Sequence, residues 1–168
     1  MAILSERLAV PSSLASNHPM RTTLIAALCA LPLISAAQKL PQPSPKGSVE
    51  QVVGLTGIEV EYSRPSMKGR KIFGELVPFG EVWRTGANQC TIIELDGPVI
   101  VEGQALAEGK YSLFTIPSPD MWVIIFNKNT ELWGEGDRKD EEDVLRVKVQ
   151  PRKLTEPVEN FTIGFDAV

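Results

Sequence analysis

Three arginines recur in a stretch of the chain that is rich in glycine, proline and aromatic residues. The stretch covers residues 62–89 and contains Arg64, Arg70 and Arg84, together with Trp83 and Asn88. A guanidinium group offers planar, paired donors that suit carboxylate, phosphate or sulfate groups. If these five side chains converge, they could line a cleft that binds a small anionic or sugar-like ligand.

The same arginines also allow a purely structural interpretation. Each could pair with Glu75, with Glu81 or with a backbone carbonyl and so fix the long stretch to the rest of the domain. Surface ion pairs of this kind are common and need not form a binding site. The protein would then be a structural component of the cell envelope.

A carboxylate-dependent hydrolase acting on glycans is a further alternative. Glycosidases use two carboxyl groups about 5 to 9.5 Å apart, and Glu75 and Glu81 are the candidate pair. No catalytic residue is assigned, because their spacing does not show that they face one another. A deep pocket with two facing carboxylates would favour the hydrolase, whereas a shallow cleft lined by arginine and tryptophan would favour a binding protein.

Histidine and cysteine usage excludes several kinds of catalytic centre. His18 is the single histidine, and Cys29 and Cys90 are the two cysteines. If an N-terminal leader is removed, the mature domain keeps Cys90 and no histidine. A Ser-His-Asp triad, a Cys-His pair and a histidine-based zinc site are then excluded, and no internal disulfide can form. We therefore expect no metal site and no cofactor.

Two charged runs are more typical of solvated surface than of ligand sites. The acidic run at 135–143 could hold calcium, but it lacks the Asp-x-Asp-x-Asp-Gly order of a calcium loop, and we expect a solvated surface loop. The basic run at 64–71 has neither a helix nor an aromatic stacking platform beside it. Since the formal net charge is −4, we expect no nucleic-acid partner.

The N-terminal residues have the pattern of a secretory signal. Residues 20–37 combine a positive start, an apolar run at 24–34 and small residues at 35–37. The apolar run is shorter than the about 20 residues that span a bilayer. We expect residues 1–19 to be a leader outside the true reading frame, cleavage after Ala37, a periplasmic or secreted location, and no membrane insertion after cleavage. An uncleaved membrane anchor is the alternative.

The remainder of the chain alternates apolar and polar residues, which is typical of β-strands. We expect a linker at 38–47 and one domain at 48–168. The predicted strands are 58–62, 91–95, 99–102, 111–116, 121–126, 145–149 and 161–165. Asp96-Gly97 predicts a hairpin between the second and third of these, and residues 71–76 could form a helical turn.

Seven or eight short strands with frequent turn residues predict an all-β fold, namely a single β-sandwich of jelly-roll or Ig-like type. Tyr111, directly after Gly109-Lys110, resembles the tyrosine corner of such folds, in which the phenol bonds to nearby backbone. The connection at 62–89 is long for a compact domain. Its apolar residues predict that it is ordered and covers one sheet, for example the outer face of 121–126.

Several short runs of the chain resemble a bacterial family catalogued as domain of unknown function 2911. These runs are YSRP at 62–65, GRKIFG at 69–74, LVPFG at 76–80, WRTGAN at 83–88, GKYSLF at 109–114, IIFN at 124–127 and DVLRV at 143–147. The resemblance extends from about residue 48 to the C-terminus. It implies an exported bacterial domain of this size and assigns no activity.

The chain departs from this family pattern at two places. Position 90 more often carries a small residue, so Cys90 is not expected to be a nucleophile. Similar proteins usually continue beyond the position of Val168 with another apolar strand that contains a tryptophan. We therefore expect the domain to lack its closing C-terminal strand, and we leave the oligomeric state open.

Overall fold

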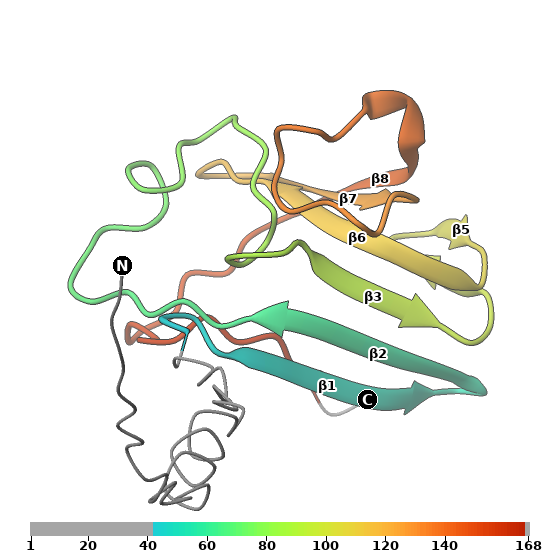
Figure 1. Cartoon of the computed structure of the whole chain (residues 1–168). Helices are drawn as coiled ribbons and strands as arrows, with labels where there is room; N and C mark the ends of the chain where they lie inside the picture. Colours follow the sequence, from blue (N-terminus) through green and yellow to red (C-terminus); the bar gives the residue numbers. More distant parts are fainter. Residues whose placement is uncertain (1–41, 167–168) are drawn as a thin grey trace, which may run out of the picture. The chain divides into compact units, whose positions relative to one another are not determined.

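The computed structural model describes residues 42–166, which form an all-β domain (Figure 1). The expected leader, signal peptide and cleavage site, and also Val168, lie outside these residues. Within them the elements are β1 (Lys46–Val53), β2 (Thr56–Ser63), β3 (Thr91–Leu95), β4 (Val99–Val101), β5 (Gln104–Leu106), β6 (Gly109–Ile116), β7 (Trp122–Asn127), the 3-10 turn η1 (Asp140–Glu142) and β8 (Asp143–Val149). The all-β class predicted from the alternation is confirmed.

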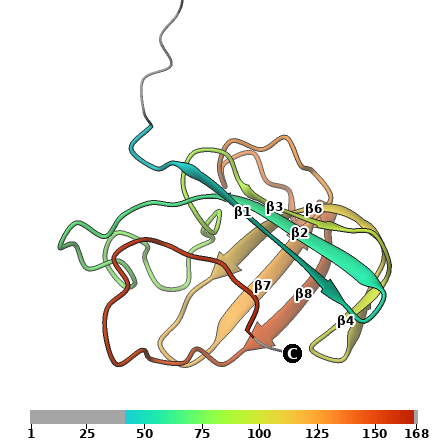
Figure 2. The ribbon, with the colours of Figure 1, turned by 90° about the horizontal axis from the view of Figure 1, so that it is seen from below.

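The strands form two antiparallel sheets of unequal size. The larger has the order β1-β2-β3-β6-β7-β8, and the smaller consists of β4 and β5. Neighbours in the large sheet are therefore neighbours along the chain, apart from the β4–β5 excursion. Figure 2 shows that the strand direction turns markedly from β1 to β8, which is the twist expected when strands accumulate their individual rotations.

The large sheet is covered on both faces. One face carries a core that includes Leu95, Tyr111 and Phe126, and the β4–β5 sheet packs on it through Val99 and Val101. The other face carries a second core, consisting of Cys90, Phe114, Ile125 and Leu132. Successive residues of β6 and β7 alternate between the two cores, as the pleat of a strand requires. This arrangement explains why residues 121–126 are apolar almost throughout.

The hairpin predicted at Asp96-Gly97 is wrong. β3 pairs with β2 and β6, whereas β4 pairs only with β5. The turn is instead tied to β2, because the Gly57 N–H donates to the Asp96 carboxylate at 2.6 Å and the Asp96 N–H donates to the Gly57 carbonyl at 3.1 Å. A two-residue hairpin is found instead at Glu102-Gly103, between β4 and β5, where φ is 49° and 77°, as a type I′ turn needs.

β1 begins inside the segment expected to be a linker. It starts at Lys46, two residues before the predicted boundary of the linker at 38–47, and it pairs with β2 along its whole length, from Lys46 opposite Ser63 to Val53 opposite Thr56. The sequence did not reveal this strand, because its exposed and half-buried positions do not produce a strong apolar alternation.

The strand predicted at 161–165 is also wrong, although its burial pattern is present. Phe161, Ile163 and Phe165 are half-buried and the residues between them are exposed. The segment is bonded to β2 largely through side chains rather than through a backbone ladder: the Tyr62 hydroxyl donates to the Ile163 carbonyl at 3.2 Å. We call residues 150–166 the C-terminal strap.

The tyrosine corner is confirmed. The Tyr111 hydroxyl donates to the Ala107 carbonyl, four residues earlier, at 3.0 Å, while the ring is 8% exposed and belongs to the first core. The bond fixes the start of β6 to the end of β5 and satisfies the one polar atom of a buried ring.

Candidate functional site

The connection between β2 and β3, residues 64–90, is ordered and is called the connecting segment below. Trp83 exchanges two backbone hydrogen bonds with Thr115, at 2.7 and 2.9 Å, so it continues the position of β3 beside β6. The Phe73 ring packs edge-on against Trp122 at the start of β7, with centroids 4.7 Å apart. The segment therefore covers this end of β7. Residues 71–76 form a hydrogen-bonded turn and no helix.

The connecting segment and the C-terminal strap together enclose a cleft of about 560 Å³. The strap contributes Val158, Glu159 and Phe161 to one wall. Most of the other lining residues come from the connecting segment, and Pro43, Ser44 and Glu135 complete the lining. Most of the lining side chains are apolar, a composition usual for small-molecule sites.

Four of the five candidate residues line this cleft. These are Arg70, Trp83, Arg84 and Asn88. Arg64 does not belong to the lining. Its Nε donates to the Phe161 carbonyl at 3.3 Å and its Nη2 donates to the Thr162 hydroxyl at 3.1 Å, so Arg64 holds the strap against β2.

The guanidinium groups of the two lining arginines are engaged with the backbone. Arg70 donates from Nε to the Met67 carbonyl at 3.0 Å and from Nη2 to the Ser66 carbonyl at 2.7 Å. Arg84 donates from Nη1 to the Asn88 and Trp133 carbonyls, both at 3.2 Å. Its Nε also lies 3.4 Å from a Glu135 oxygen. Both arginines therefore make contacts of the kind that the structural interpretation predicts, mainly with backbone carbonyls.

The polar atoms of Trp83 and Asn88 also fix the wall of the cleft. The Trp83 indole N–H donates to the Gly86 carbonyl at 3.1 Å. The Asn88 amide donates to the Ser44 carbonyl at 3.2 Å, which attaches the chain just before β1 to the connecting segment. Both residues thus shape the cleft as well as line it.

Unusual backbone conformations gather around the cleft. Lys68, Thr85 and Asn88 have φ values of 50°, 54° and 59°, and such values are rare for a β-branched residue such as Thr85. Thr85 is held in place by buried hydroxyls: Thr91 donates to its carbonyl at 2.6 Å, and its own hydroxyl lies 3.2 Å from that of Thr115. Strain that is stabilised in this way concentrates at functional sites.

A chain of aromatic rings joins the walls of the cleft. Phe73 contacts Trp83 with centroids 5.6 Å apart, Trp83 contacts Phe161 at 5.3 Å, and Phe161 contacts Tyr62 at 5.7 Å, all edge-to-face. This geometry is the favourable one for aromatic pairs. Phe161 is therefore the residue that closes the strap onto the connecting segment.

The charges of the lining balance. Its cations are Lys68, Arg70 and Arg84, and its anions are Glu81, Glu135 and Glu159. The carboxylate pair suggested for a hydrolase does not meet in the cleft, because Glu75 is outside the lining and pairs with Lys71 at 3.2 Å.

The sequence did not reveal the contribution of the strap. Phe161 stood out only through its alternation with Ile163 and Phe165, which predicted a strand in a sheet. Glu159 gave no signal of its own, because nothing in the order of residues shows that the strap returns to β2. The Met67 N–H, which donates to the Glu159 carbonyl at 2.7 Å, marks where the two segments meet.

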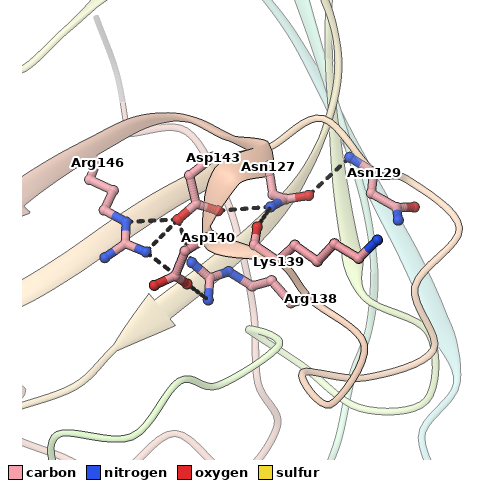
Figure 3. Close-up of polar contacts among 7 residues, drawn as sticks. All are labelled: Asn127, Asn129, Arg138, Lys139, Asp140, Asp143 and Arg146. Atoms are coloured by element: carbon pink, nitrogen blue, oxygen red, sulfur yellow. Dashed lines mark hydrogen bonds and ion pairs between the residues drawn. The ribbon is translucent and has the colours of Figure 1, made fainter.

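The acidic run at 135–143 is mostly exposed, as expected of a surface loop, but two of its side chains are not. The side chains of Arg138 and Asp143 are 6% and 5% exposed and form a buried ion pair. Figure 3 shows that Asp143 also receives hydrogen bonds from Asn127 and Arg146, and the bond to this carboxylate raises the pKa of Arg146. The cluster fixes the loop between β7 and β8, which carries Trp133 and Glu135 to Arg84.

Cys90 is not arranged as a nucleophile. It is 4% exposed, and burial raises the pKa of its thiol to about 11, so the reactive thiolate is scarce at neutral pH. Among residues 42–166, no group of three histidine, cysteine, aspartate or glutamate side chains could hold a metal ion. No helix in this range is long and apolar enough to cross a membrane.

The fold and the site together define a class of protein: an all-β domain whose C-terminal strap lines a cleft. The chain belongs to the family described as protein of unknown function DUF2911, whose family model matches residues 44–168. The matched residues include all eight strands, β1 to β8, as well as the connecting segment and the strap. The comparisons found no similar curated protein and no similar solved structure.

Proposed function

We propose that this domain binds a small anionic or sugar-like ligand in the cleft between the connecting segment and the C-terminal strap. The observation that carries the proposal is the cleft itself, whose volume of about 560 Å³ lies in the range of small-molecule sites. The strained backbone of Lys68, Thr85 and Asn88 around it supports a functional rather than an incidental hollow.

The structural role of the arginines supports this proposal as well. Because Arg70 and Arg84 bond to carbonyls of the connecting segment and the neighbouring loop, the wall of the cleft is rigid before a ligand arrives. A preformed site loses less conformational entropy on binding than a site that must first be ordered. The arginines can therefore hold the connecting segment in place and, by doing so, preform a site for a ligand.

A bulky residue at the mouth of the cleft should abolish binding. Val158 lines the cleft and is 57% exposed, so V158W should narrow the cleft without disturbing the core. The matched control is L154W, on the same strap at a position that is 65% exposed and outside the lining. A thermal-shift screen with sugars, dicarboxylates, phosphate and divalent ions should find a ligand for the native protein and for L154W, but not for V158W. Equal responses of V158W and L154W would place the ligand elsewhere.

We further propose that the domain acts outside the cytoplasm, in the periplasm or as a secreted protein. The basis is the signal-like pattern of residues 20–37. Mass spectrometry of protein exported by a bacterial host should show a mature N-terminus at Gln38. Recovery of the protein in the membrane fraction with residues 24–34 still attached would contradict cleavage and support the anchor instead.

A further inference from the structure

The charge distribution of the cleft narrows the class of ligand. Sites for anions normally present an excess of positive charge, which attracts the ligand and stabilises it once bound. Here three cations are matched by three carboxylates within one lining. An anion entering this cleft would meet Glu81, Glu135 and Glu159 at the same time as the basic residues.

Two of the three basic groups, Arg84 and Arg70, are in addition already engaged with other protein groups. Arg84 is shared between two carbonyls and the Glu135 carboxylate, and Arg70 donates to two carbonyls of its own turn. To bind an anion with paired donors, either guanidinium would have to give up some of these bonds. The lost bonds would offset much of what the new ones contribute.

The carboxylates, by contrast, retain accepting capacity. Among residues 42–166 no ion pair involves Glu81 or Glu159, and Glu159 accepts one hydrogen bond, from the Lys68 N–H at 2.9 Å. A carboxylate has about four acceptor positions on its two oxygens. It can therefore accept hydrogen bonds from two adjacent hydroxyl groups of a ligand.

We infer that the ligand of the cleft is an uncharged molecule rich in hydroxyl groups, such as a mono- or disaccharide, rather than an anion. This inference rests on the proposed function. The ligand hydroxyls donate to Glu81 and Glu159, and its C–H faces pack on the apolar lining that includes Phe73, Trp83 and Phe161. A mostly apolar surface with a few acceptors is the complement of a sugar ring.

The test compares Glu81→Gln with Glu75→Gln by isothermal titration calorimetry. Both changes remove one carboxylate from the connecting segment, but only Glu81 lines the cleft. The probes are glucose, N-acetylglucosamine, maltose and cellobiose on one side, and phosphate, sulfate, succinate and citrate on the other. We expect at least one sugar to bind, with an affinity about tenfold lower in E81Q, since bonds to a charged acceptor are the stronger ones, and unchanged in E75Q.

The ionic strength and the sign of the E81Q effect separate the outcomes. Binding of a neutral sugar should be nearly the same at low and high salt, whereas binding of an anion should weaken as salt is added. An anion that binds in a V158W-sensitive manner and binds more tightly to E81Q would overturn the sugar inference and leave the cleft as the binding site. No binding by any probe of either class would contradict the proposed function itself.

Discussion

Asp143→Asn should lower the free energy of unfolding by about 3–5 kcal/mol, the usual cost of breaking a buried ion pair from one side. The carboxylate accepts from Arg138 and Arg146 on one oxygen and from the Asn127 amide on the other. An asparagine at position 143 would place its NH₂ group, itself a donor, against either the two arginines or the Asn127 amide, which are donors as well. It would also leave the Arg138 charge, of which 6% of the side chain is exposed, without its buried partner.

Asp140→Asn is the matched control for this change. Asp140 pairs with the same two arginines, Arg138 at 2.8 Å and Arg146 at 3.1 Å, but its side chain is 71% exposed. Because solvent screens exposed pairs, we expect a loss of at most about 1 kcal/mol. Chemical denaturation with urea measures both variants. Equal losses would show that the cluster in Figure 3 behaves as surface and does not anchor the loop between β7 and β8.

Phe114→Ala should have an effect of similar size through a different mechanism. Phe114 is 0% exposed at the centre of the second core, and deletion of such a ring usually costs about 3–5 kcal/mol. The Arg138 guanidinium also lies 5.6 Å from its ring centroid, so the substitution removes a cation–π contact as well. A domain of this size should then melt roughly 10–20 °C lower.

Phe79→Ala tests whether the loss comes from burial. It removes the same atoms from a ring that is 43% exposed, and we expect a loss of less than about 1 kcal/mol. Differential scanning calorimetry of the two variants gives the comparison. A small loss for Phe114→Ala would contradict the expected cost of the cavity and would mean that the second core readily collapses around the missing ring.

The strands with strong apolar patterns were predictable and those with weak ones were not. Residues 91–95 and 145–149 were placed correctly, because burial of one face imposes an alternation on the sequence. β1 was missed, since none of its residues is fully buried. The hairpin was misplaced because the turn preference of Asp96-Gly97 is local, whereas the bonds between Asp96 and Gly57 that decide the outcome join distant parts of the chain.

The candidate site was predictable on the side formed by one continuous run of residues. Arg70, Trp83, Arg84 and Asn88 lie within 19 positions of one another, and the richness of that run in anchoring residues indicated an ordered wall. Arg64 belonged to the same run, yet its side chain turns to the strap. The remaining part of the cleft lining comes from the C-terminal strap. A local sequence pattern cannot predict that the strap contacts the connecting segment, because the two are far apart along the chain.

The order of strands has a consequence for how the domain folds. Because each strand of the large sheet pairs with the next strand of that sheet along the chain, no connection within the sheet is longer than the connecting segment at 64–90, and such comparatively local contacts form early. The bond between Arg64 and the Phe161 carbonyl instead closes a loop of 97 residues, and closure of a long loop is entropically costly. The strap should therefore dock last, and a nascent or partly unfolded chain would hold a nearly complete sheet before it has a place for a ligand.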